Sequence, residues 1–393
     1  MTEKATPKRN VSRFDLIVIG TIGLALLATI AIAILSTPEE RGPSVAYLAP
    51  YASGGVPNIW IAPLDDPSAA EQVTFTKIGV FDFDVSADGR FIVYAARDGD
   101  SDFNDIYLLN LQTGSNQRIT ACQEAEADCT SPAYRDTGDL VAYVRVDTNI
   151  SVPNVGPGAQ RVWVIDIRQQ PYQTRPLAGN SQIIGHSPQW ADDGRSIAFF
   201  SSDIGNSGVM YYNYAPTEGQ QPLLLMASEA GEVGTLSPDG SQLVYPTFGD
   251  SGGYNRHLNL VNTTDAEPIE PTMLTPDDGS VDDATADFHP SGQKLLIERR
   301  YEDEERRTNG HQLYQYDMLT GNVTPLVVDA HFQHGLAHWN ATGDKIVFQR
   351  VRLYNQDGTP ATLSPPEVWV FDVAEDNMTL ISDNGFWPVW VAP

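Results

Sequence analysis

Acid–base or metal chemistry needs histidines and carboxylates that converge, and the sequence offers a small set of candidates. Three histidines, His331, His334 and His338, fall within the run HFQHGLAHW, and His186 begins another segment. Neutral imidazoles can bind transition metals and exchange protons near neutral pH. We interpret these residues first as polar loop residues, because no pair of carboxylates has a spacing that indicates acid–base catalysis. No catalytic residue is therefore predicted.

The run RDGDSDFND has the spacing of a calcium-binding loop over part of its length. Oxygen-bearing side chains occupy every second position, at Asp98, Asp100, Asp102 and Asn104. An EF-hand loop also needs glycine at its sixth position and glutamate at its twelfth. Phe103 and Leu109 stand there instead. A polar hairpin loop is the preferred interpretation, with Ca²⁺ as the alternative and no other cofactor expected.

The string GDSGG at 249–253 matches the sequence around the nucleophilic serine of trypsin-like proteases. Serine catalysis also needs a histidine base and an orienting acid on a matching scaffold. Here the string lies between two predicted strands of one repeat. A glycine-rich hairpin loop explains it fully.

The two cysteines of the chain, Cys122 and Cys129, bracket the short polar loop CQEAEADC. In an exported protein a local disulfide is the expected outcome. A thiolate metal site is disfavoured, because no other cysteine is available to complete it. The sequence therefore predicts a Cys122–Cys129 disulfide.

A repeat of about fifty residues positions all of these candidates. Six segments each join a polar-glycine turn to an apolar, β-rich run: 86–96, 135–145, 191–201, 237–247, 289–299 and 340–350. An apolar residue four positions before each glycine indicates a strand entering the turn, and two further strands follow downstream. Four antiparallel strands per repeat are typical of a β-propeller blade.

The two ends of the repeat region determine the number of blades. Residues 44–64 supply a second and a third strand with no first strand before them, whereas FWPVWVAP at the C-terminus supplies a first strand alone. The segment around 389–391 should therefore pair with the segment around 45–48, which closes the ring. The predicted fold is all-β: a seven-bladed propeller closed by a C-terminal strand.

The turn Ser237-Pro238-Asp239-Gly240 carries a family resemblance, and 86–89 and 289–292 match it in part. A Ser-Pro-Asp-Gly turn before an apolar strand resembles the blade hallmark of TolB-like propellers, within the wider WD-repeat-like class. The resemblance covers roughly residues 42–393 and implies a propeller fold. TolB itself resembles a six-bladed propeller with an extra α/β domain, so the resemblance does not transfer its partners.

The N-terminal segment predicts a membrane anchor. Residues 16–35 carry no charge, and 20 apolar residues suffice to cross a hydrocarbon core of about 30 Å. Basic residues precede the segment, which places the N-terminus in the cytoplasm and exports the remainder. Cleavage as a signal peptide is the alternative. The expected organisation is a cytoplasmic tail at 1–14, a transmembrane helix at 15–36, a linker at 37–43 and a propeller at 44–393.

Charge and repeat architecture together narrow the function. The formal charge of −27 argues against nucleic acid as a partner. The leading hypothesis is a non-enzymatic, membrane-tethered module that binds a protein partner in the cell envelope. Its binding face would be built from the connections that lead into the first strands, including Asp82, His186, Asp282, Asp283, His331, His334 and Trp387. The alternatives are an extracytoplasmic enzyme that acts on glycans or other small substrates through channel-facing Asp82, Asp84, Asp287 and the histidines, and a structural spacer.

Overall fold

The computed structural model divides the chain into two units, residues 1–41 and 42–393. It describes residues 41–393 except 52–53, 100, 153, 181, 204–206, 215–222, 250–253, 265–269 and 363. None of the helices in these described ranges has the length and apolar character to cross a membrane. The predicted span at 15–36, Asp100 and most of the GDSGG string lie outside the described residues.

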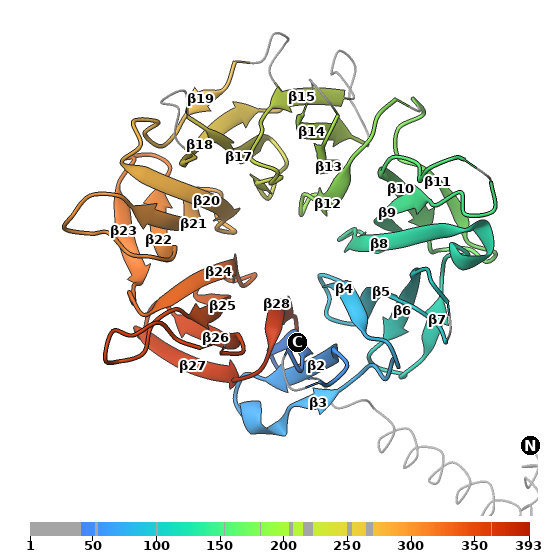
Figure 1. Ribbon diagram of the computed structural model, residues 1–393, viewed down its shortest axis with the longest axis horizontal. Helices are drawn as coiled ribbons and strands as arrows, with labels where there is room; N and C mark the ends of the chain where they lie inside the picture. Colours follow the sequence, from blue (N-terminus) through green and yellow to red (C-terminus); the bar gives the residue numbers. More distant parts are fainter. Residues whose placement is uncertain are drawn as a thin grey trace, which may run out of the picture. The chain divides into compact units, whose positions relative to one another are not determined.

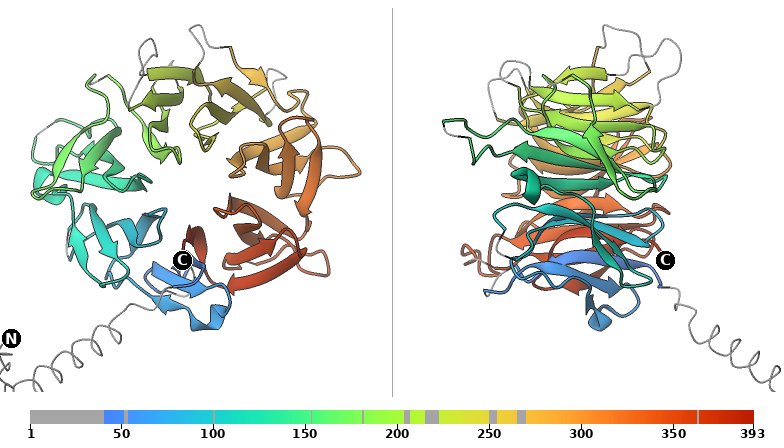
Figure 2. Two further views of the ribbon diagram at one scale, coloured as in Figure 1. Left: turned by 180° about the vertical axis from the view of Figure 1, so that it is seen from behind. Right: turned by 90° about the vertical axis from the view of Figure 1, so that its right-hand side faces the viewer.

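Residues 42–393 form a ring of seven four-stranded antiparallel sheets around a central channel (Figures 1 and 2). We number the blades from 1 to 7 along the chain. From the channel outwards, blade 1 contains β28 (Phe386–Val391), β1 (Ser44–Ala49), β2 (Asn58–Pro63) and β3 (Glu71–Gln72). Blade 2 contains β4 (Val80–Val85), β5 (Phe91–Ala96), β6 (Asp105–Asn110) and β7 (Asn116–Arg118). Blade 3 contains β8 (Ala127–Tyr134), β9 (Leu140–Asp147), β10 (Arg161–Asp166) and β11 (Gln173–Pro176).

The remaining blades repeat this order. Blade 4 contains β12 (His186–Trp190), β13 (Ser196–Ser201), β14 (Gly208–Asn213) and β15 (Leu223–Ala227), and blade 5 contains β16 (Thr235–Leu236), β17 (Gln242–Phe248), β18 (Arg256–Asn262) and β19 (Thr272–Met273). Blade 6 contains β20 (Val281–Phe288), β21 (Lys294–Tyr301), β22 (Gln312–Asp317) and β23 (Val323–Val327). Blade 7 contains β24 (Phe332–Trp339), β25 (Lys345–Arg352), β26 (Glu367–Asp372) and β27 (Asn377–Ser382). The predicted count of seven blades is confirmed.

The C-terminal strand closes the ring as the sequence predicts. β28 pairs with β1 in antiparallel register, with Val391 opposite Ser44 and Val389 opposite Ala46. Blade 1 thus combines the two ends of the propeller, and β28 covers the inner edge of β1 that would otherwise be open to another chain. The disulfide prediction is also confirmed, because Cys122 and Cys129 are bonded.

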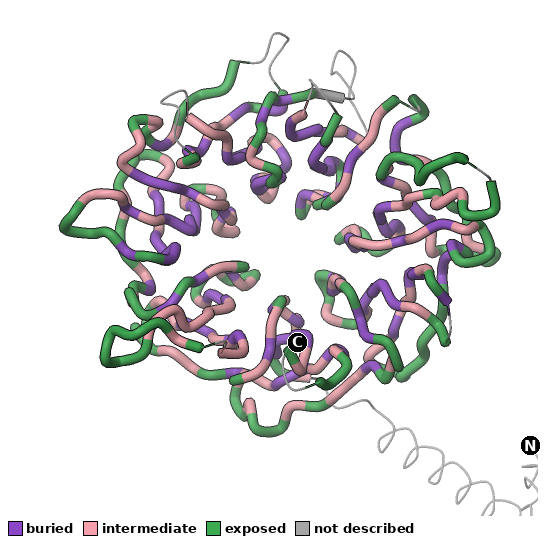
Figure 3. The backbone as a smooth tube through the Cα atoms, in the orientation of Figure 1, coloured by how far each residue is buried: buried purple, intermediate pink, exposed green. Residues whose placement is uncertain are grey.

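The core consists of apolar layers between neighbouring blades. Successive side chains of a strand point to opposite faces of the blade. In β5, Ile92 and Tyr94 therefore pack toward blade 1, whereas Val93 and Ala95 pack toward blade 3. Figure 3 shows buried backbone along the blades and exposed backbone in the outer loops. Since each blade buries apolar surface on both faces, its stability depends on both neighbours.

The propeller has two distinct faces. Hairpins that join the first to the second strand and the third to the fourth strand of a blade form one side, which we call the turn face. The second-to-third loops and the links between blades form the other, the connection face. Because β1 is a second strand, the propeller's chain begins at the turn face.

The innermost strands are irregular at the point where they line the channel. Bulges interrupt the pairing of β4, β8, β12, β20, β24 and β28 with their neighbours. Four non-glycine residues at these bulges have positive φ angles: Ser131, Ser187, Leu336 and Trp387. Bulges re-aim side chains and often occur beside functional sites.

Candidate functional site

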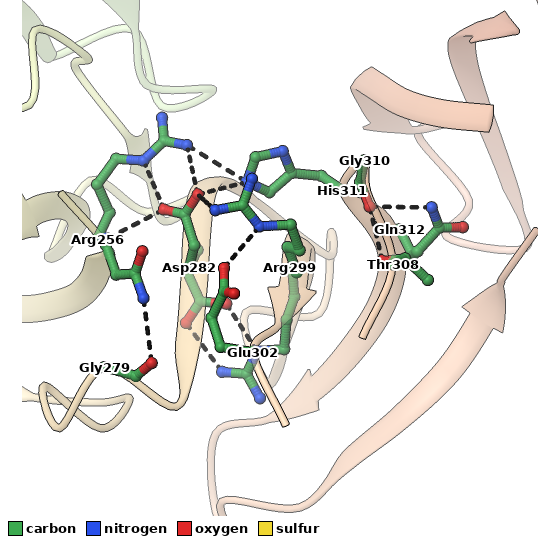
Figure 4. A network of polar contacts seen from close by, with 12 residues as sticks. Arg256, Gly279, Asp282, Arg299, Glu302, Thr308, Gly310, His311 and Gln312 are labelled. Atoms are coloured by element: carbon green, nitrogen blue, oxygen red, sulfur yellow. Dashed lines mark hydrogen bonds and ion pairs between the residues drawn. The ribbon is translucent and has the colours of Figure 1, made fainter. Parts of the chain in front are cut away.

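Three of the predicted binding-face residues are buried. Asp282, Asp283 and His334 are 4%, 0% and 0% exposed. Asp282 belongs to a polar network that joins blades 5 and 6 (Figure 4), and Asp283 pairs with Arg299 inside blade 6. The roles of both carboxylates are therefore structural.

Asp282 bonds with both sides of the boundary between blades 5 and 6. Its Oδ1 accepts a hydrogen bond from Arg256 Nε of blade 5 at 2.9 Å, and its Oδ2 lies 3.0 Å from His311 Nε2. Burial alone would raise the pKa of Asp282, but the hydrogen bonds with His311 and Arg256 hold it well below its usual range. The ionised carboxylate thus links blade 6 to blade 5 through its hydrogen bond with Arg256.

The neighbouring Asp283 forms a buried bidentate ion pair. Arg299 donates from Nε to Oδ1 at 2.6 Å and from Nη2 to Oδ2 at 2.9 Å, and the arginine is 4% exposed. Such fork geometry satisfies both carboxylate oxygens at once. The side chain has no surface with which to meet a partner.

His334 packs among aromatic rings of blade 7. Its ring lies 5.5 Å from that of Phe348 and 6.4 Å from that of Phe332. Burial, reinforced by the charge of Arg350, lowers the pKa of His334 to about 4. The imidazole is neutral under ordinary conditions.

The other predicted residues retain some accessible surface. His331 is exposed and lies 3.0 Å from Asp329, and His186 is half-buried against Phe200. Trp387 is 42% exposed. Asp82 is half-buried in the channel wall, where its Oδ2 accepts a hydrogen bond from Ser131 N of the next blade at 2.7 Å.

Large apolar side chains are exposed mainly on the connection face and the adjoining channel wall. Sixteen large apolar side chains are exposed in the described residues, and twelve of them lie on this side of the propeller. Seven of the twelve belong to blades 1, 2 and 7 or the links between them, and we call them the apolar patch: Tyr51, Val56, Phe75, Ile78, Phe81, Leu336 and Trp387.

Local contacts hold in place the segments of blades 1 and 2 that carry part of this patch. The Tyr51 ring packs edge-on against Phe386 at 5.3 Å. The loop that carries Val56 is tied to β4 by a hydrogen bond from Val80 N to Pro57 O. Phe81, Leu336 and Trp387 lie at bulges of three successive innermost strands. Of the seven residues of the apolar patch, the sequence predicted only Trp387 as part of a binding face, because no periodic pattern distinguishes an apolar residue at a bulge from a buried one.

Acidic residues gather in the channel toward the turn face. Asp84 Oδ2 and Asp287 Oδ2 each accept a backbone N–H of the following blade, from Tyr134 and Trp339 respectively. Burial raises the pKa of Asp84 to about 6. Desolvation together with the charges of Asp192 and Asp84 raises the pKa of Asp136.

His338 connects this group to blade 7. Its Nδ1 lies 3.4 Å from Asp287 Oδ1. Desolvation would lower the pKa of His338, but the contact with Asp287 raises it overall. The carboxylates and this imidazole could together exchange protons with a ligand in the channel.

Metal binding receives no support from the described part of the chain. Within it, no three His, Cys, Asp or Glu side chains come together in a way that could hold a metal ion. Asp98 and Asp102 are exposed. The Asn104 amide nitrogen donates to Asp128 at 2.8 Å, whereas its buried Oδ1 accepts no hydrogen bond. The calcium alternative therefore stays a prediction.

Comparisons with known proteins give the fold. No family model and no curated protein matches the sequence. Among solved structures, TolB from Acinetobacter baumannii matches with a TM-score of 0.51 and 14% identity, over 93% of this chain and 70% of that chain. An oligogalacturonate lyase in complex with manganese matches with a TM-score of 0.56 and 16% identity, over 81% and 83%.

Peptidases contain the same fold as part of longer chains. A puromycin-hydrolysing peptidase of Mycobacterium tuberculosis matches with a TM-score of 0.60 and 12% identity, over 89% of this chain and 55% of that chain. The fold and the channel together define a closed seven-bladed β-propeller. This fold is similar to the fold of TolB, and proteins of different activities share it.

Proposed function

We propose that this protein is a non-enzymatic binding module, tethered to a membrane outside the cytoplasm, that holds a protein partner on its connection face. The observation that carries this proposal is the apolar patch. Soluble proteins rarely leave large contiguous apolar areas exposed unless another molecule covers them. Aromatic anchors are also enriched among the residues that dominate binding energy at interfaces.

Backbone conformation supports the same conclusion. Leu336 and Trp387 have φ angles of +51° and +56° while 41% and 42% exposed. Left-handed conformations cost residues with a Cβ atom about 1–2 kcal/mol, and glycine at either place would avoid that cost. Strain of this kind concentrates at ligand-binding sites, where it holds a side chain in a fixed orientation.

Pull-down of the full-length protein from detergent extract tests the proposal. We expect a triple substitution, Phe81→Ser, Leu336→Ser and Trp387→Ser, to abolish recovery of a partner identified with the wild type. The matched control is Leu319→Ser, which removes a residue that is 93% exposed on the turn face. Equal partner recovery from the folded triple variant would overturn the proposal.

One observation favours a second candidate, an extracytoplasmic enzyme that acts on glycans or other small substrates. Asp84, Asp287 and His338 line the channel. Burial raises the pKa of Asp84, and the imidazole of His338, whose pKa is also raised, lies 3.4 Å from the Asp287 carboxylate. Groups of this kind are typical of catalytic sites. Turnover of a glycan panel, lost in Asp287→Asn and retained in the triple patch variant, would establish the enzyme in place of the binding module.

A further inference from the structure

A polar pocket lies away from the channel, in the crevice between blades 2 and 3. Its volume is about 300 Å³, at the lower end of the range of roughly 300–1,000 Å³ for small-molecule sites. Six of its lining residues carry the argument: Arg118, Cys122, Tyr143, Arg145, Tyr172 and Thr174. The disulfide partner Cys122 fixes the loop that forms one wall.

Two guanidinium groups reach this pocket from different blades. Arg118 ends β7 of blade 2, and Arg145 lies in β9 of blade 3. The Arg145 guanidinium also stacks over the Trp163 ring at 4.8 Å, which holds its plane in place. Two positively charged donors on one pocket are unusual in a chain with a formal charge of −27.

Three carboxylates pair with these arginines. Arg118 Nη1 lies 3.3 Å from the buried Asp105, a contact that a ligand would leave in place. The other two carboxylates lie at the rim: Arg118 Nη2 is 2.6 Å from Glu124, and Arg145 Nη2 is 2.8 Å from Asp147. Both rim carboxylates have side chains that are 56% exposed, and exposed ion pairs contribute little because water screens them. A ligand carboxylate that reaches both guanidiniums would accept charge-assisted hydrogen bonds from two arginines at once, whereas each rim carboxylate pairs with one arginine.

Hydroxyl and aromatic groups complete the lining. The buried Tyr143 hydroxyl bonds with Thr174, and this pair can exchange hydrogen bonds with a ligand hydroxyl. Tyr172 contributes a half-buried ring, and its hydroxyl is held by Gln117 at 2.9 Å. An aromatic face of this kind packs well against the C–H groups of a sugar ring.

We propose that the crevice between blades 2 and 3 is a binding site for a small hydroxylated carboxylate of the sugar-acid class. The ligand carboxylate bridges Arg118 and Arg145 in place of Glu124 and Asp147, and its hydroxyls meet Thr174 and Tyr143. The site shares no residue with the apolar patch or with the channel group, so the result of testing it is separate from the result of testing the proposed function.

Calorimetric titration of the full-length protein in detergent tests the site with three probes: galacturonate, galactose and N-acetylglutamate. We expect galacturonate to bind with a millimolar dissociation constant and the other two at least about tenfold more weakly. Galactose lacks the carboxylate, and N-acetylglutamate lacks the hydroxylated ring. Equal affinity for galactose, equal affinity for N-acetylglutamate, or no measurable galacturonate binding would overturn the proposal.

Substitutions then separate recognition from folding. Arg145→Gln should weaken galacturonate binding at least about tenfold, whereas Arg168→Gln, which alters an exposed Arg–Asp pair of the same blade, should leave it unchanged. The double variant Glu124→Gln, Asp147→Asn should bind galacturonate several-fold more tightly, because the competing carboxylates lose their charge. Unchanged binding in folded Arg145→Gln, or weaker binding in the double variant, would refute the assignment.

Discussion

Side chains that cross from one blade to the next determine how neighbouring blades are aligned. The carboxylates of Asp82, Asp84 and Asp287 each accept a backbone N–H from the innermost strand of the following blade. Trp190 and Trp390 donate in the opposite direction, to carbonyls of the preceding blade. These bonds satisfy backbone groups of the innermost strands, which have a neighbouring strand on one side only.

Gly89 provides the first prediction at this scale. Its φ is +65°, and a Cβ added there would lie 2.1 Å from the backbone oxygen of Ala392, just after the closing strand. Gly292 has a similar φ of +69° but open space around it. We expect Gly89→Ala to lower the free energy of unfolding by about 3 kcal/mol and Gly292→Ala by about 1 kcal/mol. Equal losses in chemical denaturation would contradict the contact.

The buried ion pair gives a second prediction. Asp283→Asn should lower the free energy of unfolding by about 3–5 kcal/mol, because it leaves the buried Arg299 charge without its counter-ion. Asp166→Asn, which breaks the exposed pair with Arg168, should change stability little. Urea titrations of both variants measure the difference, and a small loss for Asp283→Asn would contradict a structural role for the pair.

At the scale of elements, closure of the ring depends on a single strand. Deleting residues 386–393 removes β28 and its buried Val391, and exposes the inner edge of β1. We expect the melting temperature to fall by about 10 °C or more and the protein to self-associate through the open edge. Removing Pro393 alone is the control, since it leaves β28 intact. An unchanged melting temperature after the eight-residue deletion would refute the closure.

Elements of this fold could be predicted from the sequence because their signals are local. Each polar-glycine turn and the apolar run after it lie within about ten residues, and the incomplete repeats at the two ends imply a shared blade. The candidate site was less predictable because its contacts join distant residues. Arg256 meets Asp282 across a blade boundary, and Phe81, Leu336 and Trp387 come from three blades. His334 alternates within β24 like any inner residue, and only packing against Phe348 distinguishes it as buried.

At the scale of the whole molecule, the ring concentrates carboxylates in its channel, and stability should respond to their ionisation. Asp82 is suited to measure this effect, because its Oδ2 accepts from Ser131 while its buried Oδ1 has no hydrogen-bond partner. Burial raises the pKa of Asp82 from its ordinary value of 3.8 to about 6. Between about pH 4 and pH 6, Asp82 therefore stays protonated in the folded protein, whereas the same side chain is ionised in the unfolded chain.

This difference predicts the pH dependence of one substitution. The stability contributed by protonated Asp82 is complete below about pH 4 and is lost as pH rises through about 6. Asp82→Asn keeps an oxygen for Ser131 and never ionises, so at pH 8 it should be more stable than the wild type by about 1–2 kcal/mol, an estimate reduced for partial solvent exposure. The advantage should shrink through pH 6 and vanish near pH 4, whereas Asp65→Asn, at an exposed position, should show no such trend. Melting curves from pH 4 to 8 measure both, and an advantage for Asp82→Asn that is constant with pH would show that the Asp82 carboxylate does not resist ionisation in the channel.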